Sequence, residues 1–207
     1  MNDGSKLETL KDEEIYKFLG IPEREKHDVQ NIVESLLSMI QKRANIVWTS
    51  PLSEFNKIVA TNIFVQSCVE YFMWTQSINI TDLRKMDECI REVMNRNKAK
   101  YKLQINSSLY LRRDKGGRGL RNMEMNYKCT KIKTAIKVLQ DNDPKMVLVR
   151  RFDMARKEKK RKSFINDAIL YAKNDFDSEL NINQNEFTFK FKKDENMETT
   201  SDYYVVA

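Results

Sequence analysis

One short stretch holds the residues whose types and spacing most suggest chemistry: LYLRRDKGGRGL, residues 109–120. Three of the chain's five glycines, Gly116, Gly117 and Gly119, lie in it, among several arginines and one lysine. Glycine lets backbone N–H groups approach an anion closely, so the stretch is a candidate phosphate-binding turn. The alternative is a tight turn that needs positive φ and leaves its cations in solvent. Residue types alone favour the tight turn.

The charge of the chain is strongly segregated. Residues 96–162 contain 22 Lys and Arg against 6 Asp and Glu, a balance of +16, and because the net charge is +7 the rest carries −9. A basic block of this size is typical of a surface that meets a polyanion, above all nucleic acid. A solvated basic face without a partner is the alternative.

The common signatures of a catalytic centre are missing from the sequence. It contains no GxxxxGK[ST], GxSxG or HExxH motif and no Asp-Asp pair. Its one histidine, His27, lies on the polar side of a predicted helix, and Cys68, Cys89 and Cys129 do not have metal-ligand spacing. We therefore expect no catalytic residue, no metal site and no cofactor in this chain.

Composition also bears on location. No stretch approaches 18 uncharged apolar residues, so we expect no membrane span and no membrane partner. The N-terminus is polar and acidic, unlike a secretory signal, and an odd number of cysteines is typical of reduced thiols. An intracellular location is expected, and RKEKKRK at 156–162 favours the nucleus, with a solvated helix face as the alternative.

The pattern of apolar residues predicts the elements that would position these groups. Apolar side chains recur at steps of three and four in residues 24–48, and again in 51–77. Ser50-Pro51 is predicted to begin the second of these helices, and Thr81 to cap a third that runs to about residue 94.

Further helices are predicted over 122–140 and from Asp143-Pro144 to Ala172, with 156–162 as the exposed middle of the latter. Short β elements are expected at 14–20 and around 108–118, and EFTFKFKK at 186–193 alternates like an exposed strand. The sequence thus predicts a mainly α fold with short β elements.

The order of the segments is more informative than any one motif. IYKFLGIPE at 15–23 precedes a long helix, and K-x-x-A-x-N at 57–62 and VEYFMW at 69–74 follow it. LRKMDECIREVM at 83–94 then leads into LYLRRDKGGRGL. Over residues 10–140 this order resembles the region after the catalytic palm in non-LTR (LINE-like) retrotransposon reverse transcriptases. There a Y-[KR]-[YF]-L-G-[IV] segment, a helical thumb, an L-D-x-x-[IL]-R helix and an R-L-Y-x-x-R-x-x-G-G-R-G-L clip follow one another.

Two positions depart from that family pattern: Met86 stands in place of the leucine of Leu-Asp, and Ser108 replaces the first arginine of the clip. The family's metal-binding aspartates precede the segment that YKFLG matches, and this chain begins too late to contain them. The resemblance therefore implies that Mg²⁺ would belong to a missing palm.

The resemblance implies a role for each matching segment. Phe18, Leu19 and Gly20 would form a primer-grip-like segment that holds the 3′ end of the growing DNA. The helices at 24–48 and 51–77 would form a thumb along the minor groove of an RNA–DNA hybrid. Side chains on the thumb and clip would contact phosphates or sugars, which positions the ligand without reading sequence. The candidates are Lys42, Arg43, Asn45, Lys57, Asn62, Arg112, Arg113, Arg118 and Arg121. For each cation, ordinary solubility is the alternative.

Charge and resemblance together predict five segments. Residues 1–22 would be a palm-edge, primer-grip segment, 23–95 a helical thumb-like domain, and 96–121 a basic connector with the glycine-rich clip. Residues 122–173 would form a basic helical region, and 174–207 an acidic, loosely ordered tail.

The expected function is non-catalytic: a fragment of an RNA-directed DNA polymerase that binds an RNA–DNA hybrid or template-primer through backbone contacts, with the missing palm as a candidate protein partner. One alternative is a stand-alone helical nucleic-acid-binding or adaptor protein with a basic face. Another is a structural protein whose basic face meets an acidic protein.

Overall fold

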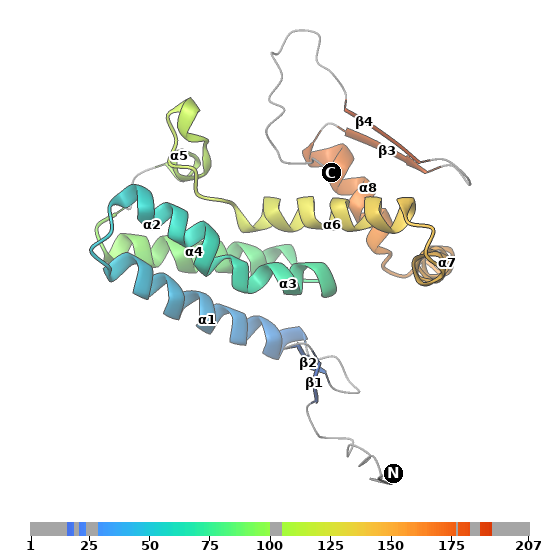
Figure 1. The fold of residues 1–207 in the computed structure, drawn as a ribbon, viewed down its shortest axis with the longest axis horizontal. Helices are drawn as coiled ribbons and strands as arrows, with labels where there is room; N and C mark the ends of the chain where they lie inside the picture. The colour runs from blue at the N-terminus through green and yellow to red at the C-terminus, as the bar shows by residue number, and fades with distance from the viewer. Residues whose placement is uncertain are drawn as a thin grey trace, which may run out of the picture. The chain divides into compact units, whose positions relative to one another are not determined.

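The mainly α fold expected from the sequence is confirmed by a computed structural model, shown in Figure 1. The structure describes residues 16–18, 21–23, 29–99, 105–176, 178–182 and 187–191. The chain divides into two compact units, Met1–Leu120 and Arg121–Ala207, and each is described by itself. The roles assigned to the five segments stay predictions.

The two long helices α1 (Val29–Thr49) and α4 (Ile80–Arg96) form the core of the first unit and lie side by side in Figure 1. Each helix buries one apolar stripe at steps of three and four residues, as an amphipathic helix does. The buried residues of these stripes include Ile32, Val33, Leu36, Ile40 and Ala44 of α1, and Leu83, Met86, Ile90, Val93 and Met94 of α4.

The second expected helix is a chain of three shorter pieces: α2 (Glu54–Ala60), the π-helical turn η1 (Thr61–Val65) and α3 (Ser67–Thr75). Its predicted start at Ser50-Pro51 is wrong. The Ser50 hydroxyl donates to the Val47 carbonyl oxygen at the end of α1 (2.6 Å), so it does not cap α2. Ser53 is the cap instead, because its hydroxyl accepts from the Asn56 N–H (3.3 Å).

The predicted cap of the third helix is also wrong, by two residues. Thr81 lies in the first turn of α4, and Asn79 occupies the N-cap position with an extended backbone. At the N-terminal side of the unit, β1 (Tyr16–Phe18) pairs antiparallel with β2 (Ile21–Glu23). A β element is therefore present within 14–20.

Residues 108–118 contain no strand, contrary to expectation. They form the single helical turn α5 (Ser107–Tyr110) and the 3-10 turn η2 (Arg113–Lys115). The reason is local: the Leu111 N–H donates to the Ser107 carbonyl oxygen (2.9 Å), which closes a helical turn where a strand would need an extended backbone.

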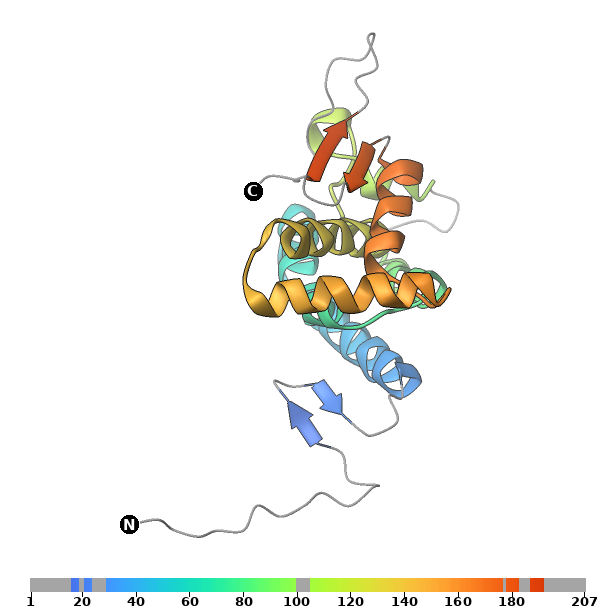
Figure 2. The same cartoon turned by 90° about the vertical axis from the view of Figure 1, so that its right-hand side faces the viewer.

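The second unit consists of α6 (Met123–Gln140), α7 (Pro144–Glu158), α8 (Phe164–Asp175) and an antiparallel hairpin of β3 (Ser178–Ile182) and β4 (Phe187–Phe191). Figure 2 shows the hairpin beside α8. The core lies between α6 and α8, and its buried members are Ile132, Ala135, Leu139, Ile165, Ala168 and Ala172. The strand predicted in EFTFKFKK is confirmed by β4.

Asp143 caps α7 through its carboxylate, which accepts from the Lys145 N–H (2.7 Å), and Pro144 follows as predicted. The predicted continuation of this helix to Ala172 is wrong. The helix α7 ends at Glu158, and Lys160 has a positive φ of 53°. RKEKKRK is thus the exposed end of α7 and the turn that follows it, rather than the middle of a helix.

The tail predicted as loosely ordered, 174–207, contains the end of α8 and the β3–β4 hairpin. The positions of Leu19, Gly20 and His27 lie outside the described residues.

Candidate nucleic-acid interface

Residues 107–120, hereafter the clip, fold back on themselves through their backbone. The chain leaves α5 at Leu111, passes through η2 and returns along α5. Four backbone hydrogen bonds of 2.9–3.0 Å close it: Arg118 N to Ser108 O, Leu120 N to Leu109 O, Gly119 N to Leu111 O and Gly117 N to Arg112 O. The buried side chains of Leu109 and Leu120 secure its base.

The three glycines of the clip meet two different requirements. Gly116 and Gly119 have φ values of 80° and 74°, which L side chains rarely adopt. Gly117 is required for space, because a Cβ there would lie 2.0 Å from the Leu111 carbonyl oxygen. The backbone N–H groups of all three donate to carbonyl oxygens within the clip. This is the geometry of a tight turn, and it leaves these N–H groups bonded to the protein rather than turned toward an anion.

Several side chains fasten the clip to the helices of the first unit. The Asn62 side-chain amide, in η1, donates to the Gly119 carbonyl oxygen (2.9 Å). Arg118 donates to the Ala99 carbonyl oxygen (2.6 Å) and forms an ion pair with Glu54 in the first turn of α2. On the other side, Arg91 of α4 donates to the Tyr110 hydroxyl (2.6 Å).

Arg113 adds an aromatic contact to these anchors. Its guanidinium lies over the Phe55 ring, 3.9 Å from the centroid, and donates to the Arg118 carbonyl oxygen (3.3 Å). Asn62, Arg113 and Arg118 were expected from the resemblance to contact phosphates. In this structure their side chains hold the clip against α2 and η1, and Arg113 also keeps an exposed surface.

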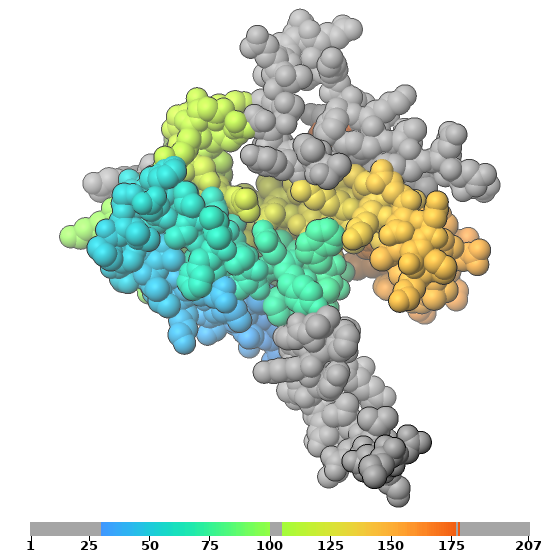
Figure 3. All heavy atoms as spheres, viewed as in Figure 1, coloured from blue at the N-terminus to red at the C-terminus, as the bar shows by residue number. Residues whose placement is uncertain are grey.

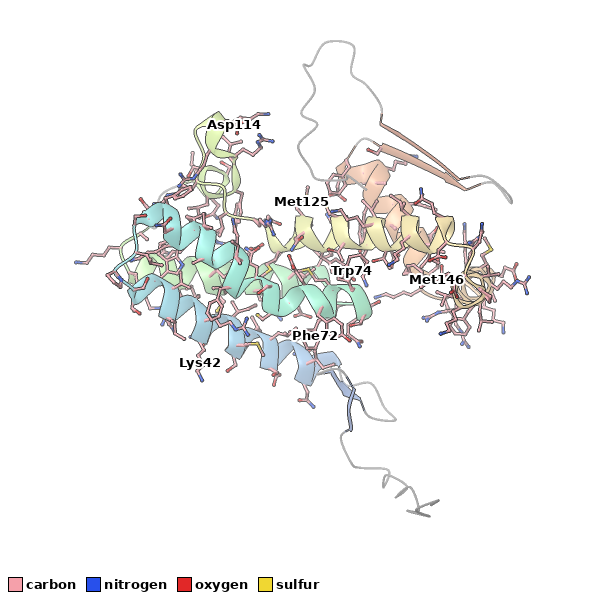
Figure 4. The ribbon with its side chains drawn as sticks, in the orientation of Figure 1. Lys42, Phe72, Trp74, Asp114, Met125 and Met146 are labelled. Carbon is pink, nitrogen blue, oxygen red and sulfur yellow. The ribbon has the colours of Figure 1, made fainter. Side chains whose placement is uncertain are left out.

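The exposed tip of the clip carries Arg112, Asp114 and Lys115 (Figure 4 labels Asp114). Arg112 pairs with Asp114, with Nε 3.0 Å from Oδ1. The hydrogen bond from Arg112 lowers the pKa of the Asp114 carboxyl below its ordinary value. Both partners are solvent-exposed, so the pair is weak and a phosphate can compete for Arg112.

The expected thumb residues differ in how they present their polar groups. Lys42 is exposed and points away from α1 in Figure 4. Arg43 donates to the Phe64 carbonyl oxygen (2.9 Å) and lies over the Phe64 ring at 4.9 Å. Lys57 donates to the Trp48 carbonyl oxygen (3.1 Å), where it caps the end of α1. Asn45 is half-buried on α1.

Two expected segments remain, one near each end of the first unit in the sequence. Phe18 is at the end of β1, and its neighbours Leu19 and Gly20 lie outside the described residues. Arg121 is exposed at the start of the second unit.

Part of the basic block in the second unit is structural. Lys128 is buried in α6, and although burial disfavours its charged form, hydrogen bonds to Asp175 (2.6 Å) and Glu124 (2.7 Å) raise its pKa. Lys131 is also buried, 5.2 Å from the Tyr127 ring centroid, and burial lowers its pKa to about 8.

The accessible part of the block is on α7 and the turn after it. Eight cations are exposed there: Lys145, Arg151, Arg156, Lys157, Lys159, Lys160, Arg161 and Lys162. The RKEKKRK motif indicated Arg156 and Lys157 at the end of α7, but nothing in the sequence analysis singled out Lys145 and Arg151 earlier in the helix. The signal available was their density, nine Lys and Arg against two Asp and Glu in residues 144–162.

The described residues contain no cluster of three or more His, Cys, Asp or Glu that would hold a metal ion. Cys68, Cys89 and Cys129 are free, and burial raises the pKa of each thiol. Among the helices in the described ranges, none is long and apolar enough to span a membrane. Comparisons with protein-family models, curated proteins and solved structures found no match to this chain.

Proposed function

We propose that the chain is a non-catalytic nucleic-acid-binding fragment of a reverse-transcriptase-like polymerase, and that it holds an RNA–DNA hybrid or template-primer by contacts to the nucleic-acid backbone. Catalysis and its Mg²⁺ ions would belong to a separate palm. The sequence resemblance supplies the polymerase part of the proposal, and the anchored clip supplies the physical support for backbone binding.

The observation that carries the proposal is the fixed presentation of cations on the clip. Asn62, Arg118 and the Phe55–Arg113 contact hold the clip in one place on the first unit. Arg112, Arg113 and Lys115 are exposed on it. Cations that are already positioned lose less conformational freedom when they meet phosphates, so a fixed clip favours binding.

A pair of exposed cations allows a direct test. Arg112→Gln with Lys115→Gln removes two charges from the clip without touching its anchors. The matched control, Arg96→Gln with Lys98→Gln, removes two exposed charges from the end of α4 and the residues after it. Fluorescence anisotropy of a labelled RNA–DNA hybrid would be measured from 50 to 200 mM KCl.

The clip variant is expected to bind more weakly. Its plot of log binding constant against log salt concentration should be less steep by about 1.8, since each phosphate contact on duplex contributes roughly 0.9 to the slope. The control should keep the wild-type slope. Asp114→Asn is expected to tighten binding, because it removes the acid that competes for Arg112. Equal effects of the clip variant and the control would contradict a role for the clip.

A further inference from the structure

The helix α7 has an inverted pattern of polarity. Its side that faces the rest of the second unit includes half-buried Arg150 and buried Asp153, which is 4% exposed. Its outer side carries Leu148 and Phe152, which are 68% and 65% exposed. A surface helix of a folded domain normally places apolar residues inward and charges outward. The exposed apolar pair therefore calls for an explanation.

Two polar anchors set the rotation of α7. Arg150 donates to the carbonyl oxygens of Val138 (3.2 Å) and Asp141 (2.9 Å) at the end of α6. Such contacts satisfy carbonyl groups that a helix end leaves unpaired.

The second anchor is the Asp153 carboxylate, which caps the start of α8. It accepts from the Ser163 hydroxyl (2.5 Å) and from the N–H groups of Phe164 (3.1 Å) and Ile165 (3.4 Å). Negative charge is favourable at a helix N-terminus. Since Arg150 and Asp153 are three residues apart and both point inward, the opposite face of α7 is held toward solvent.

That outward face combines an aromatic ring with positive charge. Helical spacing of four and seven residues puts Leu148, Arg156, Lys145 and Lys159 on the same face as Phe152. The Arg156 guanidinium lies 5.9 Å from the Phe152 ring centroid. The two acids of residues 144–162 are Asp153, which points inward, and Glu158, six residues from Phe152 and off this face. Figure 3 shows atoms of α7 (orange) at the surface.

We propose that this face of α7 binds single-stranded nucleic acid, with a base stacked on Phe152 and the flanking cations in contact with phosphates. Exposed aromatic rings set among cations bind single strands, because every unpaired base offers a face for stacking. Duplex offers phosphates but few open base faces, so an exposed ring contributes little to duplex binding. The site is on different residues from the clip, and the proposal does not rest on the function assigned to the clip.

The test uses the full chain and two labelled 20-nucleotide ligands of equal length: oligo(dT) and an RNA–DNA hybrid. Phe152→Leu keeps an apolar side chain but removes the ring, and Phe152→Trp keeps a ring. Leu170→Ala, at an exposed apolar position of α8, is the matched control. Stability of each variant is followed by thermal denaturation.

Phe152→Leu is expected to weaken oligo(dT) binding about 5- to 150-fold, the equivalent of one lost base stack of 1–3 kcal/mol. Phe152→Trp should bind at least as well as wild type, and its tryptophan emission should fall when oligo(dT) is added. Leu170→Ala should match wild type. Hybrid binding should respond to the Arg112 and Lys115 variant and not to Phe152→Leu, which separates this proposal from the one for the clip.

Three results would overturn the proposal. The first is unchanged oligo(dT) affinity in Phe152→Leu. The second is a fall in melting temperature for Phe152→Leu that Leu170→Ala does not show, because Phe152 would then be a packing residue. The third is binding to vesicles of anionic lipid that depends on Phe152 while oligo(dT) binding does not, which would identify a membrane surface as the partner.

Discussion

The two adjacent glycines of the clip predict a sharp difference between alanine variants. At Gly117 a Cβ would lie 2.0 Å from the oxygen, 2.3 Å from the carbon and 2.5 Å from the Cβ of Leu111. These atoms belong to the backbone or are fixed to it, so the clip must open. Opening strains or breaks the bonds from Gly117 N to Arg112 O and from Gly119 N to Leu111 O. Two hydrogen bonds at about 1 kcal/mol each and an overpacking cost of about 1–3 kcal/mol predict a loss of roughly 3–5 kcal/mol.

Gly116→Ala is the matched control for this loss. Its Cβ would meet nothing within 4 Å, so the only cost is the positive φ of 80°. That cost is about 1–2 kcal/mol for an L residue. The two variants make the same chemical change one residue apart: Gly116→Ala has only the cost of the positive φ, and Gly117→Ala has only the cost of the steric overlap.

Urea denaturation followed by tryptophan fluorescence would measure the difference. Both tryptophans of the chain, Trp48 in α1 and Trp74 in α3, are in the first unit, so their emission reports the unit that carries the clip. Gly117→Ala is expected to lower the free energy of unfolding by at least 1 kcal/mol more than Gly116→Ala. Equal stability of the two variants would refute the clip geometry described above.

Two further predictions concern the second unit. Asp153→Ala should lower the free energy of unfolding by about 2–3 kcal/mol, because it removes the buried carboxylate that accepts from the Ser163 hydroxyl and from the first two N–H groups of α8. Glu158→Ala, at an exposed position of α7, should change it by less than about 0.5 kcal/mol. Thermal denaturation by far-UV circular dichroism measures both, and equal losses would contradict this role of Asp153. Burial lowers the pKa of Lys131 to about 8 from 10.5, so between these pH values the unfolded state binds more protons and stability rises with pH. Lys131→Met should remove that rise, and at pH 7 the variant should be more stable than wild type by up to about 3 kcal/mol. Urea denaturation at several pH values measures this, and an identical pH dependence of the two proteins would contradict the prediction.

Local signals allowed much of the fold to be predicted. The apolar steps through Ile32, Leu36 and Ile40 indicated α1 and its buried face. Asp143-Pro144 marked the start of α7 correctly, because a cap and a proline at the first helical position act within one turn. These signals need no knowledge of distant residues.

The errors arose where a distant residue decides the local structure. No proline or glycine marks the end of α7, and the break depends on Asp153 reaching Ser163 and the first N–H groups of α8. Ser50 and Ser53 are equally good caps by type, and the bond from Ser50 to Val47 O selects between them. A single sequence does not reveal such contacts.

The candidate site shows the same limit. The glycines and arginines of the clip were recognisable as a group, but the link between Asn62 and Gly119 spans 57 residues. The stacking of Arg113 on Phe55 was likewise invisible. Residue types therefore indicated where a basic surface would be, and tertiary contacts decided which of its members are anchors and which are exposed.

The most direct test of the central claim is a titration of the wild-type chain with a labelled RNA–DNA hybrid at 50, 100 and 200 mM KCl, with an acidic peptide of 12 to 40 residues as competitor. Binding to the nucleic-acid backbone through at least three cations predicts a slope of about −2.7 or steeper for log binding constant against log salt concentration. It also predicts that the acidic peptide does not displace the hybrid. A slope near zero, or displacement of the hybrid by the peptide at lower concentration than unlabelled hybrid, would contradict the account.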